Sequence, residues 1–195
     1  MTLELLPLVF TSGWASGVNA YATVLLLGLL GRFAGVDAVP SGLERTDVLV
    51  AAAALYAVEF VADKIPAVDS TWDAIHTAIR PTVGAVIGLL VAGDADSLET
   101  AVLASTGGVT ALLSHLVKSG LRLAVNTSPE PASNIGVSLA EDFSVAGVIA
   151  LAVAAPWVAA GVAATLLVTG LVLVAVLAAR IRRGLRRRRA RRAGP

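Results

Sequence analysis

Acidic residues and a histidine gather in one short stretch between apolar runs. Residues 59–81 read EFVADKIPAVDSTWDAIHTAIRP and contain four carboxylates, one of the chain's two histidines and an arginine. Carboxylates bind protons and hard cations, and a histidine adds affinity for transition metals. An ionised side chain near the middle of a membrane helix costs about 2.5 to 3.5 kcal/mol, so a chain that keeps several is expected to use them. The stretch predicts a site for an ion or a small polar solute.

A second polar group of opposite sign occurs later in the chain. His115, Lys118 and Arg122 recur at intervals of three and four residues, which places them in one stripe of a helix. Two acids follow in a polar segment, and an asparagine lies near the first glycine pair. The predicted binding site or charge network comprises Asn19, Glu59, Asp63, Asp69, Asp73, His76, Arg80, His115, Lys118, Arg122, Glu141 and Asp142.

Two interpretations of this set remain open. In the first, the groups form a buried site, in which Glu59 and Asp63 meet Lys118 or Arg122. Asp73 and His76 are then expected nearer the membrane interface. In the second, the acids of residues 63–80 belong to an interfacial helix, solvated and paired among themselves. Asn19 is expected to form an interhelical hydrogen bond rather than to bind a ligand.

Enzymatic motifs are absent from the sequence. It contains no HExxH, Walker loop or GxSxG, and without cysteine it has no thiol nucleophile or thiolate metal site. We expect no catalytic residue and no cofactor, and the sequence leaves open whether a metal binds. Aspartate and histidine acting on a lipid head group are the remaining enzymatic alternative.

The composition is that of an integral membrane protein. Apolar residues make up 56% of the 195 residues, charged residues only 15%, and the mean hydropathy is +0.81. Glycine and proline inside apolar runs fit this class, because membrane helices tolerate both. We expect an all-α, multi-pass bundle of five or six transmembrane segments in the cell membrane. Residues 1–179 are expected to form one transmembrane domain, with halves at 10–93 and 98–160.

The first half predicts helices of unequal length. A short or broken segment precedes a transmembrane helix at 20–30, and Gly13 and Gly17 have the spacing that lets another helix approach closely. A second helix is expected over 46–62. Pro66 then predicts a break, followed by an amphipathic interfacial or re-entrant helix over 69–80. Pro81 is expected to restart the chain as a short apolar segment.

The second half predicts longer helices. One continuous helix is expected over 98–125, and its Gly107-Gly108 pair again suits close packing. Residues 126–142 predict a loop, because they are rich in proline, serine and asparagine. The apolar run over 143–179 is too long for one crossing, so two spans meeting at Pro156 are expected.

The C-terminus differs in charge from the rest of the chain. Nine arginines lie between Arg180 and Arg192, which leaves six basic against fourteen acidic side chains before them. Because they follow an apolar run, we expect 180–195 to be a disordered cytoplasmic tail on anionic lipid, with no nucleic acid partner. The expected lipid contacts are Arg182, Arg183, Arg186 and Arg187. A homo-oligomer or a partner membrane protein is the other expected contact.

The sequences of the two halves are weakly similar. SGVNAYATVLLLGLLGR at 16–32 is similar to GGVTALLSHLVKSGLRL at 107–123, and each is followed by a Pro-Ala pair and a short apolar segment. With three crossings per half, such repeats would be inverted. Inverted repeats with interrupted helices around central polar groups are typical of transporters.

Three motifs carry a family resemblance. They are SGxNAYxxxLxLGLxGR at 16–32, EFxADKIPxxDSxWDxIHTxIRP at 59–81 and SPEPxSNxxxSxxED at 128–142. Together they resemble the bacterial membrane-protein family catalogued as domain of unknown function 4126, over about residues 10–155. The resemblance implies a small polytopic membrane protein and supplies no activity or site residue. From the charged segment and the similarity between the two halves, we expect transport or permeation of an ion or small polar solute through a buried charged site. A non-catalytic module that binds lipid or a partner membrane protein is the alternative.

Overall fold

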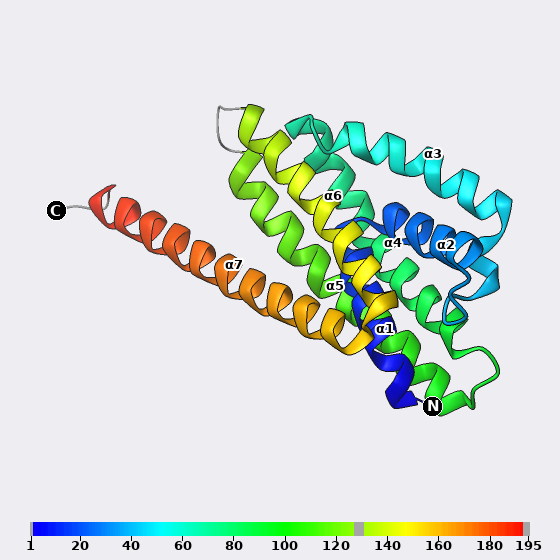
Figure 1. Cartoon of the computed structure of the whole chain (residues 1–195). Helices are drawn as coiled ribbons and strands as arrows, with labels where there is room; N and C mark the ends of the chain where they lie inside the picture. The colour runs from blue at the N-terminus through cyan, green and yellow to red at the C-terminus, as the bar shows by residue number, and fades with distance from the viewer. Residues whose placement is uncertain (1, 127–130, 193–195) are drawn as a thin grey trace.

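The computed structural model describes residues 2–126 and 131–192, and every regular element in these ranges is helical. The elements in chain order are α1 (Thr2–Val18), α2 (Ala20–Ala34), the 3-10 turn η1 (Ser41–Glu44), α3 (Thr46–Ala62), α4 (Pro66–Ala92), α5 (Ser97–Asn126), α6 (Pro131–Ala154) and α7 (Pro156–Arg192). Figure 1 shows a bundle from which α7 projects on one side. The predicted all-α bundle is confirmed.

Four helices are long and apolar enough to cross a membrane. Their candidate spans are Val68–Ala92, Ser97–Val125, Ala132–Ala154 and Pro156–Gly184. Helix α2 is apolar but has 15 residues, which reach about 22 Å of a ~30 Å hydrocarbon core. Helix α3 begins and ends where expected, and its 17 residues reach about 26 Å. The membrane class is confirmed, with four full-length candidates where five or six crossings were expected.

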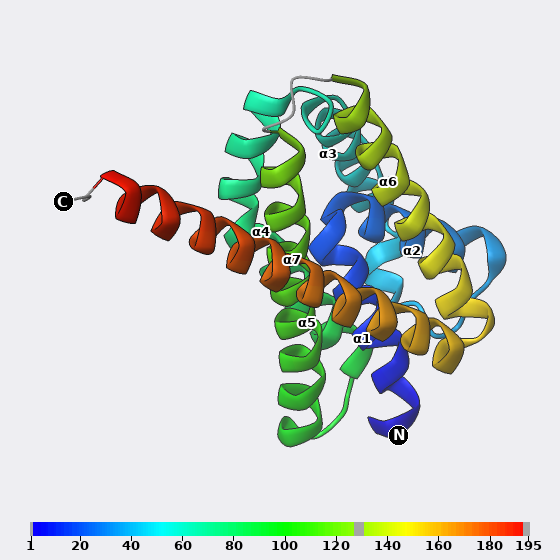
Figure 2. The same ribbon diagram turned by 90° about the vertical axis from the view of Figure 1, so that its left-hand side faces the viewer.

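Helix α1 occupies the centre of the bundle. All residues over 11–20 are buried, and α1 packs against α4, α5, α6 and α7. Both ribbon views show α1 lying alongside α5 (Figures 1 and 2). A Cβ atom added at Gly13 would lie 2.6 Å from the carbonyl oxygen of Gly107, and one at Gly17 would overlap the backbone of Ala111. The predicted close approach at this glycine pair is confirmed.

Helix α4 reaches α5 at the same glycine. A Cβ atom added at Gly84 would lie 2.6 Å from the Gly107 carbonyl oxygen, so three backbones converge on Gly107. In a bilayer, helices associate through van der Waals packing, and small residues let the backbones approach closely. This glycine contact, formed by Gly13, Gly17, Gly84 and Gly107, sets how α1, α4 and α5 cross.

Helix α4 corrects the expectation of a separate interfacial helix. It runs unbroken for 27 residues through Pro81, so it is about 40 Å long and counts as a candidate span. Its polar face is turned inward: Asp69, Asp73 and Arg80 are buried, whereas Ile75 is 54% exposed. An apolar environment reverses the usual orientation of an amphipathic helix, because lipid solvates the apolar face.

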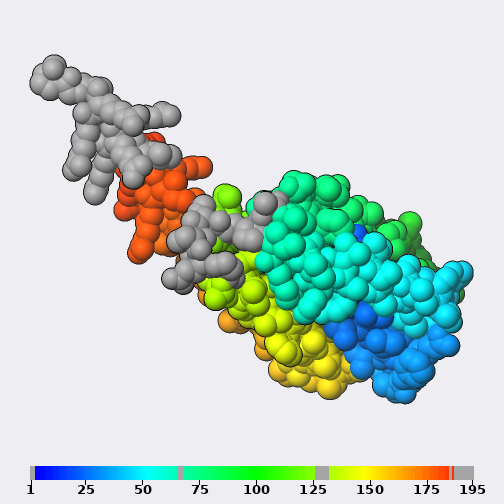
Figure 3. Space-filling view, turned by 90° about the horizontal axis from the view of Figure 1, so that it is seen from above, coloured from blue at the N-terminus to red at the C-terminus, as the bar shows by residue number. Residues whose placement is uncertain are grey.

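Helices α6 and α7 are divided where the sequence predicts, but α6 begins earlier in the chain than expected. Helix α6 ends at Ala154 and α7 begins at Pro156, which confirms the two spans. The expected loop over 126–142 is wrong, since α6 begins at Pro131; only 127–130 lie outside the described residues. Proline suits the first turn of a helix, where its missing N–H has no partner to lose. Figure 3 shows α7 extending beyond the bundle.

Candidate functional site

Ionisable side chains from four helices meet inside the bundle. Helices α3 and α4 supply acids and an arginine, α5 supplies a lysine and a second arginine, and α6 supplies two further acids. We call these residues the charge network: Glu59, Asp63, Asp69, Asp73, Arg80, Lys118, Arg122, Glu141 and Asp142. The side chains of the central Glu59–Arg80 pair have no exposed surface. The structure thus brings the two predicted groups of opposite charge together.

The break between α1 and α2 provides backbone partners for this network. Helix α1 ends at Val18, and its last carbonyl groups point at cations: Gly17 O accepts from Arg80 Nη1 at 3.3 Å, and Val18 O accepts from Lys118 Nζ at 3.0 Å. The C-terminal end of a helix carries partial negative charge, which favours cations there. The interruption at Asn19 therefore places two cations in the middle of the bundle.

Asn19 both caps a helix and joins two helices. Its Oδ1 accepts a hydrogen bond from Ala22 N at 2.9 Å, so it is the N-cap of α2. Its Nδ2 donates to Asp142 Oδ1 at 3.2 Å, which links α2 to α6. The expected interhelical role is observed, and the capping role adds to it.

Arg80 is the most enclosed cation of the network. Its Nη2 donates to Glu59 Oε1 at 2.7 Å, and its Nη1 lies 3.1 Å from Asp73 Oδ1. The same Nη1 lies 2.8 Å from His115 Nδ1. Glu59 was expected to meet Lys118 or Arg122. Its shortest partner is Arg80, and it also forms a longer ion pair with Lys118, whose Nζ lies 4.0 Å from Glu59 Oε1.

Lys118 connects α5 to α3 and α6. Its Nζ donates to Asp63 Oδ2 at 2.8 Å and lies 3.6 Å from Glu141 Oε2. The Val18 carbonyl oxygen accepts a second hydrogen bond from Nζ. The expected meeting of Asp63 with Lys118 is observed, and this ammonium group adds a longer ion pair with Glu141 to its two hydrogen bonds.

Arg122 holds the ends of α3, α4 and α6 together. Its Nη1 donates to Asn134 Oδ1 at 2.6 Å, and its Nη2 donates to the Asp63 carbonyl oxygen at 3.0 Å. The guanidinium also lies 3.5 Å from Asp69 Oδ1 and 3.2 Å from Glu141 Oε2. A planar group with five donors suits such a junction, because it serves several acceptors at once.

Hydrogen bonding assigns a neutral tautomer to His115. Its Nδ1 faces an arginine N–H, which only donates, so Nδ1 carries no proton. Its Nε2 lies 3.0 Å from Thr77 Oγ1, which itself donates to the Asp73 carbonyl oxygen. Nε2 therefore carries the proton, and His115 is an uncharged member of the site between α4 and α5.

His76 takes a structural position. Its Nδ1 lies 2.8 Å from the Trp72 carbonyl oxygen and its Nε2 lies 3.1 Å from the Tyr21 hydroxyl, so both ring nitrogens are used. The ring stacks against Trp72 at 4.8 Å and meets Tyr21 edge-on. Both Asp73 and His76 are buried within the bundle, and their place relative to the membrane interface stays a prediction.

The charge network holds more acids than bases. Six carboxylates surround three cations, and Lys64 at the edge of the network adds a fourth, with its Nζ 2.8 Å from the Phe60 carbonyl oxygen. Fully ionised, the set would carry two negative charges in excess. Three of its buried oxygens, Glu59 Oε2, Asp63 Oδ1 and Asp142 Oδ2, have neither a hydrogen bond nor an ion pair with the described part of the chain. Burying such charge without a partner costs several kcal/mol, so the network favours an added positive charge.

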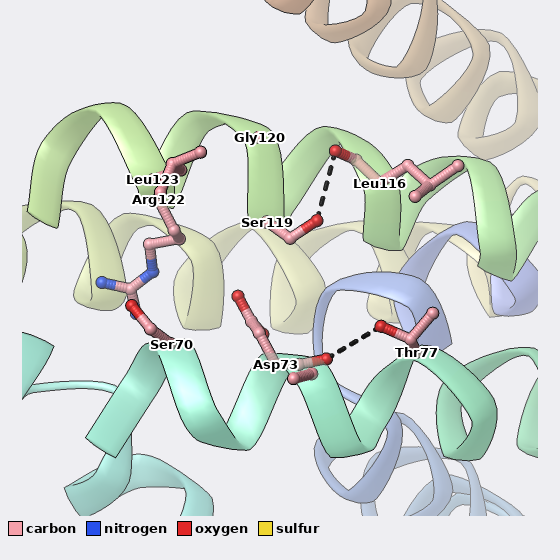
Figure 4. A pocket seen from close by; sticks show the side chains of 9 residues that line it. Ser70, Asp73, Thr77, Leu116, Ser119, Gly120, Arg122 and Leu123 are labelled. Atoms are coloured by element: carbon pink, nitrogen blue, oxygen red, sulfur yellow. Dashed lines mark hydrogen bonds between the residues drawn. The ribbon is translucent and has the colours of Figure 1, made fainter. Parts of the chain in front are cut away.

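A cavity of about 330 Å³ between α4 and α5 reaches the network from the outer face of the bundle. Figure 4 shows the Asp73 side chain pointing across it toward Ser119, with Thr77 nearby and Arg122 at one end. Ser70 adds another hydroxyl to the lining, and leucine and small residues complete it. The cavity gives small polar species access to Asp73.

Metal binding has no support in the described ranges, where no group of three or more His, Asp or Glu side chains is arranged to hold a metal ion. The carboxylates instead face arginine and lysine. Among the expected lipid contacts, Arg182, Arg183 and Arg186 are exposed on α7. The side chain of Arg187 lies outside the described residues.

Several partners of the network were not anticipated. Asn134 accepts from Arg122 and donates from Nδ2 to the Asp63 carbonyl oxygen at 3.1 Å. Thr77 binds His115, and Ser16 Oγ donates to the Arg80 carbonyl oxygen at 3.1 Å. Asn134 lies inside the third family motif, which is the one sequence signal that pointed to it. Short polar side chains elsewhere in membrane helices are too common to be singled out.

Comparison with known proteins establishes the family and nothing narrower. A family model described as domain of unknown function (DUF4126) matches residues 6–176. The chain belongs to this family, and all residues of the charge network lie in the matched range. No curated protein and no solved structure matched the chain.

Proposed function

We propose that this membrane protein binds protons in its charge network and conducts them, alone or with a small polar solute, across the bilayer. The observation that carries the proposal is the surplus of buried carboxylates over cations. Three carboxylate oxygens of the charge network have neither a hydrogen bond nor an ion pair with the described residues. Charged residues inside membrane proteins are costly and commonly serve ion or proton pathways.

A proton can neutralise the excess negative charge of the buried carboxylates with fewer ligands than a metal ion needs. A metal ion needs several oxygen or nitrogen ligands in a fixed geometry, which the described residues do not offer. A proton needs one carboxylate and turns it into a hydrogen-bond donor. The arginines and the lysine hold the acids in place while the surplus charge is neutralised.

The cavity between α4 and α5 supplies the access that this function needs. Asp73 lines it, and Asp73 Oδ1 lies 3.1 Å from Arg80, which in turn binds Glu59. Thr77 lies in the same lining, and its hydroxyl contacts Nε2 of the neutral His115. Acids and a neutral histidine thus lead from the cavity to the interior.

Proton flux in proteoliposomes tests the proposal. Purified protein is reconstituted with a trapped pH-sensitive dye, and a potassium diffusion potential drives protons. We expect acidification faster than in protein-free vesicles. Glu59→Gln should lower the rate at least tenfold, since it removes a buried acid whereas its amide oxygen still accepts from Arg80. The matched control is Asp47→Asn, which removes an exposed acid that pairs with Arg45 outside the network.

Two results would refute the proton function. One is a wild-type rate equal to that of protein-free vesicles, and the other is an unchanged rate in Glu59→Gln. Size-exclusion profiles of each variant show whether the fold is retained. Parallel runs with sodium and potassium gradients distinguish proton movement from that of another small cation.

Exposed arginines at the end of α7 favour a second function, a membrane module that binds anionic lipid with its C-terminus on the cytoplasmic side. This function predicts copurified anionic lipid that is lost in an Arg182→Gln/Arg183→Gln variant. The charge network then serves stability alone, and acidic substitutions leave lipid binding unchanged.

A further inference from the structure

A second cavity lies on the other side of α5, between α1, α6 and α7. Its volume is about 250 Å³. Trp14, Val18, Val117 and Leu121 form apolar walls, and Leu166, Leu173 and Gly170 of α7 line the side away from the bundle centre. Lys118, Glu141 and three hydroxyl-bearing residues form its polar part. The cavity therefore combines an apolar body with a charged end.

The charged end of the cavity offers a carboxylate as a hydrogen-bond acceptor. Lys118 Nζ donates to Asp63 Oδ2 and to the Val18 carbonyl oxygen, and it lies 3.6 Å from Glu141 Oε2, beyond hydrogen-bond distance. No described residue donates a hydrogen bond to Glu141 Oε2, and the cations nearest to this oxygen lie 3.2 and 3.6 Å away. Its side chain is 16% exposed, unlike the other acids in contact with Lys118. A ligand head that donates hydrogen bonds to Glu141 fits this end.

The opposite end of the cavity faces the lipid. Leu166 and Leu173 are 42% and 48% exposed, and both lie within the candidate span of α7. Figure 2 shows α7 crossing in front of α5 before it leaves the bundle. A ligand can therefore enter from the bilayer and leave its chain among the lipid tails.

We propose that this cavity binds the head and first carbons of a membrane-resident amphiphile with a primary ammonium group. The ammonium donates to Glu141 and supplies positive charge to a network that is short of it, and the chain follows Leu166 and Leu173. A carboxylate head would instead bring a second negative charge next to Glu141 at the same end of the cavity. The inference goes beyond proton conduction and holds whether or not protons cross the membrane.

Trp14 provides the reporter, because it lines this cavity. In a Trp72→Phe/Trp157→Phe variant, Trp14 is the only remaining tryptophan. Titration with a bromoalkyl amine should quench its fluorescence to saturation, at a concentration about tenfold lower than a bromoalkanol or a bromoalkanoic acid of equal chain length. If the double variant loses its size-exclusion peak, the same titration is run on the wild type, and unlabelled dodecylamine must reverse the quenching.

Three variants decide the assignment. Glu141→Gln should reduce the tenfold preference for the amine to parity, whereas Asp47→Asn, which removes an exposed acid outside the charge network and outside this lining, should keep it. Ser144→Leu should fill the cavity and abolish saturable quenching by all three probes. Equal half-saturation by amine and alcohol, or a preference that survives Glu141→Gln, overturns the proposal. Proton flux measured on the same preparations shows separately whether conduction fails.

Discussion

Helices α4 and α5 pack together in two different ways along their length. In one half, Gly84 of α4 and Gly107 of α5 bring the backbones into direct contact. In the other half, Asp73 and Arg80 face His115 and Arg122 across buried polar space. Both cavities that reach the charge network lie in this second half. One half fixes the crossing of the helices, and the other holds buried charge beside two cavities.

The difference has a physical reason. Apolar side chains gain little from meeting each other in lipid, so tight backbone contact is the effective way to hold two membrane helices. Charged groups instead need many partners, which long side chains from several helices supply in the charged half. The two halves should therefore respond to different substitutions.

The largest effect is expected from removing the central cation. Arg80→Ala leaves Glu59 and Asp73 buried without their partner, which should lower the free energy of unfolding by about 3 to 5 kcal/mol. Thermal unfolding in detergent measures the change. The matched control is Arg45→Ala. Arg45 also lies 2.7 Å from a carboxylate, Asp47, but these two side chains are 67% and 66% exposed.

This control should leave the unfolding temperature almost unchanged, because exposed ion pairs contribute little. The hydrogen bond from Arg45 lowers the pKa of Asp47 to about 2, so Asp47 is ionised and this pair is intact in the unmodified protein at neutral pH. Equal losses in the two variants would show that burial does not distinguish the charged half from the surface.

The glycine half should show the next largest effect. Gly107→Ala places a Cβ atom against the backbone of Gly84, with its carbonyl carbon 2.9 Å away, and backbone gives way less easily than a side chain. We expect a loss of about 1 to 3 kcal/mol by the same unfolding measurement. Gly147→Ala is the control, since nothing lies within 4 Å of its added Cβ atom. A Gly107→Ala protein as stable as this control would contradict the tight contact.

The smallest effect is expected at Asn19, in the break between α1 and α2. Asn19→Ala removes the cap of α2 and the hydrogen bond to Asp142, which should cost about 1 kcal/mol. Asn19→Ser keeps an acceptor for the cap and should recover part of that loss. If Asn19→Ala costs as much as Arg80→Ala, Asn19 stabilises the charge network as strongly as its central cation and does more than cap α2.

Much of the helix content followed from sequence pattern. The 46–62 helix, the long helix over 98–125 and the division at Pro156 are observed where the pattern places them. The helix boundaries at Pro66 and Pro131 were harder to predict, because proline both ends helices and begins them. Pro81 lies inside α4, where packing from neighbouring helices overrides its local preference. The proposed repeat gains no support, since 16–32 is interrupted at Asn19 and 107–123 is one unbroken helix.

The sequence predicted which residues form the site better than it predicted which of them pair with each other. Helical spacing placed Asp69, Asp73 and Arg80 on one face, but spacing does not say whether that face meets water or the bundle. The preference of Glu59 for Arg80 over Lys118 depends on distances between helices, which no local pattern encodes.

The sequence by itself determined a membrane-embedded all-α chain, its family, and two polar stripes of opposite charge, because hydropathy and helical period are local properties. Only the tertiary structure decided that α4 turns its polar face inward and that the end of α1 contributes carbonyl groups to two cations. It also decided that two cavities reach the charge network from opposite sides of α5. These features depend on how three helices cross at Gly107, and that crossing joins residues far apart in the chain.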